Sequence, residues 1–462
     1  MSAVNLLSPI LNGGIQNVNF VNGRVLTAAD MTAERAANIQ RQRLMGECVG
    51  EGVATGLEVT FSSQSKAYGV QVVHVTAGVA VNRNGEVLQL ASDIDLSLVV
   101  ALQTATATPG TFNPCEGPQT ILTNPGIWVL TIQPATGYQG QAPTTQLNSN
   151  GVATICTSQY KTSGVQFQMS SATLNSSGSG LQPKLYALAN EIQTKLNAGA
   201  AASSLGPQLS QFRNGLAHVC FGTEELASYA ANPFAGLPLV SAFETYGLID
   251  ALRNSNLMSD CSVPLAIMYW TQQGIQFVDM WSVRRPVFPT AASEDWPIFT
   301  GRRRAAEGMA MFLQFQDQIN DLLNPANGTA PATSISGSDY FVFLPSAGLL
   351  PIPGVQSLPG FNYPQFFGNQ TVRPNSPAYT RDARFTEFLR DSFLFPPINL
   401  ASKEIIWLYL VPGNIQFANQ RGAQPYVMFA GAQLSYQGDS RFDASYWDFS
   451  NYSLVAGQFV VA

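Results

Sequence analysis

Residues 265–283 read LAIMYWTQQGIQFVDMWSV, and this stretch decides much of the predicted fold. Two strongly apolar runs flank a short polar segment at 271–274 that ends in glycine, which is the pattern of a β-hairpin. Because the apolar residues do not alternate with polar ones, we expect both strands to be buried on both faces. The stretch therefore predicts a buried hairpin.

The end of this hairpin carries a charged residue in apolar surroundings. Asp279 needs a partner there, because an unpaired buried carboxylate is costly. Arg284 or Arg285 is the expected partner, in a salt bridge that is either buried or at an interface. Catalysis by Asp279 is the weaker alternative.

A long amphipathic helix is predicted from Arg302 to about residue 323. Asn324-Pro325 ends it, and its apolar stripe is formed by Phe312, Phe315, Ile319 and Leu322. Trp281 and Trp296 lie between the hairpin and this helix in the sequence, and we expect them to pack the two together. Earlier helices are predicted at 185–196, 208–217 and 242–256.

The N-terminal hundred residues predict a strand, a helix and further strands. Residues 20–26 form a short strand with a tight turn at Asn22-Gly23. Thr27 and Asp30 have the spacing of a helix N-cap, and good helix formers fill 28–45. Strand-like segments follow up to residue 100, with a turn at 82–85. The last strand alternates Ile94, Leu96 and Leu98 with polar residues, which predicts one buried face.

The fold class predicted is α+β and β-rich, with small antiparallel β-sandwich or barrel modules and a few amphipathic helices. At about 100–200 residues per domain, 462 residues indicate several domains. We place them at 1–100, a docking module; 101–180, a β continuation that includes an exposed loop at 137–152; 181–325, a mixed helix and hairpin region; and 326–462, a C-terminal β domain rich in proline and aromatic residues. Residues 341–378 predict irregular chain, because prolines disfavour helices and central strands.

The composition disfavours several classes of function. Only 11% of residues are charged and the net charge is −6, so a nucleic-acid partner is not expected. The basic run Arg302–Arg304 is expected to be solvated or paired at an interface. No stretch has the ~20 apolar residues of a membrane span, and no signal peptide is visible, which predicts cytoplasmic synthesis. So little charge suggests that partners cover much of the surface.

The residues that usually carry chemistry are scarce. The two histidines, His74 and His218, are expected to be structural residues on strands, and they are too few for a three-histidine metal site. Five cysteines without a C-x-x-C spacing fit neither a disulfide scaffold nor a zinc site. Cys220 and Cys261 lie in apolar runs and predict buried thiols. We therefore expect no cofactor, no metal and no enzymatic activity. The weak exception is Glu294-Asp295 beside Trp296, which would suit a glycoside hydrolase.

Two stretches resemble a known module. Residues 19–60, NFVNGRVLTAADMTAERAANIQRQRLMGECVGEGVATGLEVT, and residues 75–90, VTAGVAVNRNGEVLQL, resemble an N-terminal module found in proteins of contractile injection systems and phage-tail-like particles. The resemblance is most specific over 15–100 and weaker over 215–350. It implies a structural subunit at the baseplate or its periphery, which docks through its N-terminal module and projects its C-terminal domains toward a target or membrane.

The expected partners are therefore other subunits of such a particle. We expect a homo-oligomer, with a trimer as the candidate state. Aromatic and arginine anchors are typical of such interfaces. The residues we predict to act at interfaces are Phe20, Asn22, Gly23, Arg24, Asp279, Trp281, Arg284 and Arg285.

The alternative function is a receptor- or carbohydrate-binding tail fibre. In that interpretation, distal aromatic side chains stack on sugars, although ordinary strand core is the competing explanation for them: Trp407, Tyr426, Tyr446 and Trp447. Contact with a membrane or cell surface is a further expectation. It rests on the apolar, proline-rich segment 349–368, which either exposes aromatic rings to a bilayer interface or folds back as core.

Overall fold

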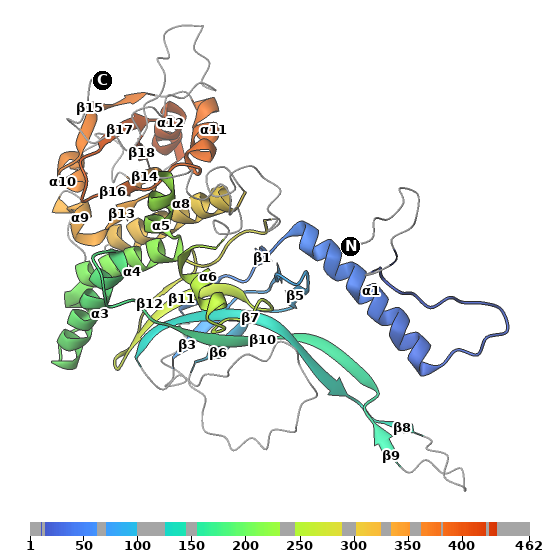
Figure 1. Cartoon of the computed structure of the whole chain (residues 1–462). Helices are drawn as coiled ribbons and strands as arrows, with labels where there is room; N and C mark the ends of the chain where they lie inside the picture. The colour runs from blue at the N-terminus through green and yellow to red at the C-terminus, as the bar shows by residue number, and fades with distance from the viewer. Residues whose placement is uncertain are drawn as a thin grey trace.

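The computed structural model describes residues 11, 14–61, 71–98, 125–144, 155–231, 245–288, 302–324, 334–351, 362–379, 382–421 and 425–431. Within them the chain forms several small, mostly antiparallel sheets with helices packed against them (Figure 1). This confirms the predicted multidomain, β-rich α+β class.

A four-stranded antiparallel sheet joins two distant parts of the chain. Its strands have the order β10-β7-β11-β12 and the bounds Tyr160–Ala172, Gly126–Gln139, Val263–Thr271 and Gly274–Asp279. The predicted hairpin is confirmed as β11 and β12, with Thr271 paired to Gly274 across the turn. The burial predicted for both strands holds for β11 but is wrong for β12, an edge strand whose residues 275–278 are only partly buried. Because β7 pairs with β11, residues 126–139 and 263–271 belong to one sheet.

Both faces of this sheet are covered, which explains the continuous apolar runs. Ile127 and Val129 of β7 face the helical side, where they pack with residues of α3, α4 and α6. Trp128 and Leu130 alternate with them and pack against the N-terminal strands. Side chains of a strand point alternately to its two faces, so both sets must be apolar.

The N-terminal strands form two three-stranded antiparallel sheets. One has the order β1-β4-β5, with bounds Gly52–Gly56, Gly78–Val81 and Val87–Leu90. The other has the order β2-β3-β6, with bounds Val59–Phe61, Val72–Val75 and Ile94–Ser97. The predicted turn at 82–85 is confirmed by the bond from Gly85 N–H to Asn82 O. The buried face predicted for β6 is wrong for Ile94, the first residue of this edge strand, because its side chain is exposed.

Helices cover the other face of the four-stranded sheet. They are α3 Leu181–Asn197, the short 3₁₀ helix Ala202–Leu205, α4 Gly206–Cys220, α5 Thr223–Ala231 and α6 Gly247–Asn254. The predicted helices at 185–196 and 208–217 are confirmed. His218 was expected on a strand, and that prediction is wrong because α4 continues through it to Cys220. The run AHVCF is apolar because this end of the helix is buried all round.

The C-terminal part is built on a second four-stranded sheet with the order β14-β18-β17-β15. Its strands are Ala347–Pro351, Tyr426–Ala430, Ile405–Leu410 and Thr371–Tyr379. Helix α8, Arg302–Leu323, packs on one face through Phe315, Ile319 and Leu322, as its predicted stripe required. Helix α11, Asp382–Ser392, packs on the other face.

The expectation of irregular chain over 341–378 is wrong in its described parts. Strands β14 and β15 lie there, and proline is tolerated because both are edge strands of the sheet. The remaining C-terminal elements are α9 Gly337–Tyr340, β13 Phe343–Leu344, α10 Tyr363–Phe367, β16 Ile398–Asn399 and α12 Pro412–Arg421.

Strands β7 and β10 extend beyond the sheet as a long two-stranded ribbon (Figure 1). The small pair β8, Ala142–Thr144, and β9, Ile155–Thr157, lies at its far end. The loop predicted at 137–152 is therefore wrong where β7 and β8 occupy it. Tyr138 and Tyr160 are exposed on this ribbon.

Helix α1, Ala28–Val49, stands to the side of the rest of the molecule (Figure 1). Its C-terminal end meets the body near β1 and β5, and its N-terminal end lies away from it. The predicted turn at Asn22-Gly23 is present, with Gly23 at φ +86°, but the strand predicted around it is not. Strands need a neighbour to pair with, and this segment has none among the described residues.

Candidate functional site

The most exposed described segment is residues 14–49, which we call the N-terminal arm. It consists of an extended lead-in, 14–27, followed by α1. Thr27 and Asp30 form a capping box: the Asp30 N–H donates to the Thr27 hydroxyl at 3.2 Å and the Thr27 N–H donates to the Asp30 carboxylate at 3.0 Å. These bonds start the helix without help from the body.

The arm exposes large apolar side chains along its length. Phe20 is 56% exposed, Val25 83% and Met45 67%. Val21, Leu26, Met31, Ile39, Leu44 and Val49 are also exposed. A folded monomer rarely leaves such side chains in water in one contiguous segment, and where it does the segment is usually a binding surface.

The arm is attached to the body at a tight contact. A Cβ added at Gly46 of α1 would lie 2.1 Å from the carbonyl oxygen of Gly85, in the turn between β4 and β5. Gly85 itself has φ +69°, a conformation that favours glycine. Arg43 forms an ion pair with Glu86 beside this contact. Two glycines thus allow the helix backbone to rest directly on the turn.

Four of the predicted interface residues lie together in the lead-in of the arm. Phe20 is exposed, Asn22 and Gly23 form the turn, and Arg24 forms an ion pair with Asp30 at the start of α1. The Arg24–Asp30 ion pair therefore ties the lead-in, with its exposed Phe20, to the start of α1.

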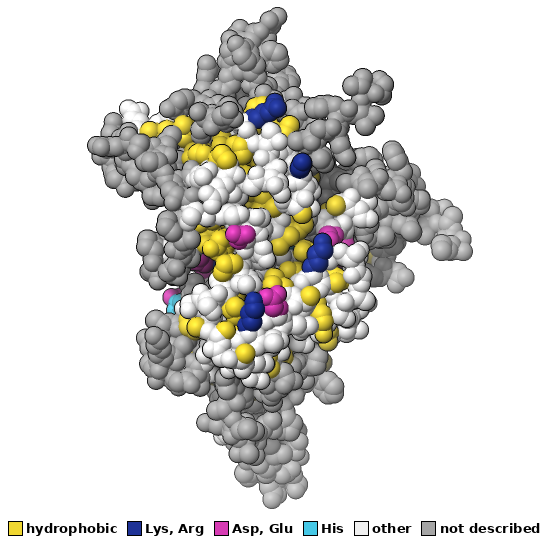
Figure 2. All heavy atoms as spheres, turned by 90° about the vertical axis from the view of Figure 1, so that its left-hand side faces the viewer, with side chains coloured by type: hydrophobic (Ala, Val, Ile, Leu, Met, Phe, Trp, Pro, Cys, Tyr) yellow, Lys and Arg dark blue, Asp and Glu magenta, His cyan; other side chains and the backbone are white. Residues whose placement is uncertain are grey.

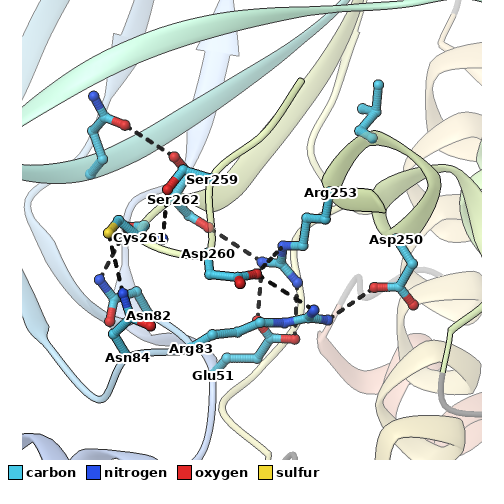
Figure 3. A network of polar contacts seen from close by, with 12 residues as sticks. Glu51, Asn82, Arg83, Asn84, Asp250, Arg253, Ser259, Asp260, Cys261 and Ser262 are labelled. Atoms are coloured by element: carbon cyan, nitrogen blue, oxygen red, sulfur yellow. Dashed lines mark hydrogen bonds and ion pairs between the residues drawn. The ribbon is translucent and has the colours of Figure 1, made fainter. Parts of the chain in front are cut away.

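Directly after the arm, a network of charged side chains fastens the N-terminal module to the middle of the protein (Figure 3). Glu51 lies just before β1 and Arg83 in the β4–β5 turn. Arg83 Nε lies 2.8 Å from Glu51 Oε2, and its Nη2 lies 2.9 Å from Asp250 Oδ1 on α6. Arg253, also on α6, completes the group at 3.0 Å from Glu51. We call these four residues the charged anchor.

Helix α8 joins the same network. Arg303 Nη1 lies 2.8 Å from Asp250 Oδ2, and Arg303 Nε lies 3.0 Å from Glu307 Oε1. The guanidinium also stacks on the Tyr246 ring, whose hydroxyl donates to Glu307 at 2.7 Å. Three segments far apart in sequence are therefore held by one set of ion pairs.

The arginines of this network stabilise the ionised form of two of its carboxylates, Glu51 and Asp250. Burial alone would raise the pKa of Glu51, but the charges of Arg253 and Arg83 outweigh it and lower that pKa. Asp250 behaves in the same way, with its pKa lowered by Arg303 and Arg83 against the effect of burial. Removing one partner from such a buried group leaves an uncompensated charge, which is strongly destabilising.

The cavity beside this network is small. Its volume is about 50 Å³, and its lining includes Glu51, Arg83, Cys220 and Phe288. Pockets that hold substrates or cofactors typically measure roughly 300–1,000 Å³. The network therefore fits a structural role.

Asp279 has a different partner from the one predicted. It is fully buried, and its Oδ2 lies 2.7 Å from Nε of Arg213 on α4. Arg213 also pairs with Asp317 and Asp321 of α8. Burial would lower the pKa of Arg213, but Asp279 and Asp317 outweigh it and raise that pKa above its usual value. The expected pairing of Asp279 with Arg284 or Arg285 is therefore wrong.

Arg284 and Arg285 instead bind backbone carbonyls within the chain. Arg284 Nη2 donates to Gly56 O of the N-terminal module, and its guanidinium lies 5.4 Å from the centre of the Trp281 ring. Arg285 donates to Trp281 O at 2.8 Å and lies over the Phe221 ring. The segment 279–285 thus lies where the N-terminal module meets the helices.

The residues predicted to stack on glycans are not gathered into one surface among the described residues. Trp407 is partly buried on β17 and packs in the core beside α11. Tyr426 is on β18, 5.7 Å from the Phe385 ring. Tyr446 and Trp447 lie outside the described residues, as do Glu294, Asp295 and Trp296. Within 349–368, Phe366 and Phe367 are buried core residues of α10, not exposed rings.

Of the two cysteines predicted to be buried thiols, one is confirmed and one is not. Cys220 is a buried free thiol, as predicted, and burial raises its pKa to about 12. Cys261 is disulfide-bonded, so the predicted thiol there is wrong. His218 is buried, 2.9 Å from the Thr223 hydroxyl, and burial lowers its pKa to about 3. His74 pairs with Asp95 on the neighbouring strand.

Across the ranges that the structure describes, no three His, Cys, Asp or Glu side chains are arranged to hold a metal ion. No helix in those ranges combines the length and the apolar character needed to cross a bilayer. No family model matches the chain, and no curated protein shows significant similarity to it.

Proposed function

We propose that this chain is a structural subunit of a contractile injection system or related phage-tail-like particle, located at the baseplate or its periphery. It docks through the N-terminal arm and projects its C-terminal domains outward. The observation that carries the proposal is the arm itself, a capped helix with its lead-in that leaves the body and exposes apolar side chains such as Phe20, Val25 and Met45. The sequence resemblance of residues 15–100 supports the same assignment.

The base of the arm is fixed to the body, as a docking element that transmits force between subunits requires. The Gly46–Gly85 contact and the Arg43–Glu86 ion pair fix the base of α1 on the β4–β5 turn. The charged anchor begins in that same turn, at Arg83, and continues to α6. A partner bound to the arm is therefore connected through short contacts to the sheets and helices of the body.

The β7–β10 ribbon provides a second extended contact surface. It carries exposed Tyr138 and Tyr160 and projects beyond the sheet, as α1 projects from the N-terminal strands (Figure 1). Two such extensions on one chain suit contacts between copies as well as contacts with other subunits, and a homo-oligomer is part of the proposal. We propose no enzymatic activity and no nucleic-acid partner.

The proposal is tested by purifying assembled particles from cells that express this chain together with its neighbouring genes. The chain should be found in the particle. The triple variant Phe20→Ser, Val25→Ser, Met45→Gln should be incorporated at least about tenfold less than the unmodified chain. A few large side chains that become buried in an interface contribute most of its binding energy.

A matched control replaces three exposed apolar residues elsewhere, Leu257→Ser, Leu394→Ser and Phe417→Ser, and should be incorporated like the unmodified chain. Equal incorporation of the arm variant would contradict docking through the arm. Neighbouring genes that encode no sheath, tube or baseplate protein would contradict the particle itself.

A further inference from the structure

A second surface of the molecule has the form of a ligand site. A groove of about 420 Å³ is bounded by four parts of the chain: α3, the first residues of β7, the end of β10 and the β11–β12 turn. This volume is within the range of roughly 300–1,000 Å³ found for small-molecule sites. It is separate from the N-terminal arm and from the charged anchor, and the proposed function makes no use of it.

One wall of the groove is a polar stripe of α3. Tyr186, Asn190, Gln193 and Asn197 all line it. Their spacing of four, three and four residues places them on one face of the helix. Gln193 donates to the Asn197 side-chain carbonyl at 3.0 Å, so these two amides are already aligned with each other. Tyr186 is 43% exposed and leaves its ring accessible.

The floor and the opposite wall are apolar, with one further amide at the rim. Ile127, Ala172, Leu174 and Tyr269 contribute the apolar surface, and Gln272 of the β11–β12 turn adds a polar group. None of the described lining residues is charged. The side of the molecule on which α3 lies in Figure 1 likewise carries few charged side chains (Figure 2).

We propose that this groove binds a neutral carbohydrate. Side-chain amides both donate and accept hydrogen bonds, which matches the hydroxyl groups of a sugar. An exposed tyrosine ring offers a face for the apolar side of a pyranose. An anionic ligand would lack a cationic partner here, and a purely apolar ligand would leave the amides without partners, which is costly.

The wall is held in place before any ligand arrives. Leu185 and Ile192, on a different face of α3 from these polar residues, are buried in the core. The Tyr269 hydroxyl donates to Ala189 O at 3.3 Å, and the Gln273 amide donates to Leu196 O at 2.9 Å, near the end of the helix. The helix that presents the amides is thereby tied to the β11–β12 hairpin. A rigid site loses less entropy on binding.

The test is a binding measurement on the full-length purified chain. Malto-, cello- and chito-trisaccharides at millimolar concentration serve as probes, with saturation-transfer NMR to detect binding and calorimetry to measure affinity. We expect at least one trisaccharide to bind. Tyr186→Ala should weaken that binding about five- to tenfold through loss of stacking, and Asn190→Ala should weaken it several-fold.

Both replaced side chains are exposed, so the variants should fold normally. Lys184→Ala is the matched control, because Lys184 is exposed on the opposite side of α3, and it should bind like the unmodified chain. Binding that is unaffected by Tyr186→Ala and Asn190→Ala would overturn the proposal, as would no binding of any of the three probes. Neither result would bear on docking through the arm, which is measured by particle incorporation.

Discussion

At the scale of the residue, Glu404 is the buried group whose ionisation should most affect stability. Its side chain lies just before β17, and its Oε1 accepts a hydrogen bond from the Asn399 N–H at 3.0 Å. Its Oε2 has no hydrogen-bond partner among the residues that the structure describes. Burial raises the pKa of this carboxyl to about 7 against an ordinary value of 4.5. The folded state therefore prefers the protonated form.

The pH dependence follows from that preference. Between about pH 4.5 and pH 7 the folded chain binds the proton more tightly than the unfolded chain, so stability falls as pH rises through this window. Glu404→Gln is neutral at every pH. It should match the unmodified chain near pH 4 and exceed its free energy of unfolding by about 3 kcal/mol at pH 8.

Urea titrations at several pH values, followed through the transition that includes the C-terminal sheet, measure this difference. Glu58→Gln is the control, since Glu58 is exposed and should show a much smaller change. A Glu404→Gln effect of the same size at pH 4 and pH 8 would contradict the assigned cause.

The sequence predicts that a buried charge needs a partner, but it does not identify the partner. That Asp279 needs a partner follows from its apolar neighbours alone. The identity of the partner does not, because Arg213 lies 66 positions earlier on α4 and is brought near only by the packing of that helix on the sheet. The charged anchor was missed in the same way. Its four residues come from three separate segments, and only the folded chain brings them together.

At the scale of the element, the attachment of α1 depends on two glycines. Gly46→Ala would put a methyl group into the Gly85 carbonyl, so the helix should lift from the β4–β5 turn and weaken the Arg43–Glu86 pair. Hydrogen exchange should become at least about tenfold faster at the end of α1 and in residues 82–86, because local contacts set local opening.

Gly206→Ala provides the control, since a Cβ at Gly206 meets nothing within 4 Å and its φ is −48°. Its exchange should match the unmodified chain. Unchanged exchange at α1 in Gly46→Ala would show that the close approach does not hold the helix.

Elements with strong local signals were predictable, and elements decided by pairing were not. The cap at Thr27, the stripe of α8 and the apolar runs of the hairpin each specify their element within a few residues. The edge strands β14 and β15 contain prolines, and only their partners β18 and β17 make them strands. The end of α4 looked like a strand because complete burial removes the helical alternation of polar and apolar residues.

At the scale of the whole molecule, the chain is a layered body with two extensions. The four-stranded sheet of β7 and β11 carries the N-terminal strands on one face and helices on the other, and α8 connects these helices to the C-terminal sheet. Two groups of ion pairs fasten the layers at separate places. One joins Arg213 to Asp279 and Asp317, and the other is the charged anchor. The sequence indicated several domains, whereas the projection of α1 and of the β7–β10 ribbon depends on tertiary structure.

In the function proposed above, the N-terminal arm is the docking element of a particle subunit. Electron cryo-microscopy of the assembled particle tests it most directly, by locating α1 in the density. We expect Phe20, Val25 and Met45 to be buried against another subunit, while the C-terminal sheet lies farther out. An arm that remains in solvent, with the body embedded in the particle by another surface, would contradict it.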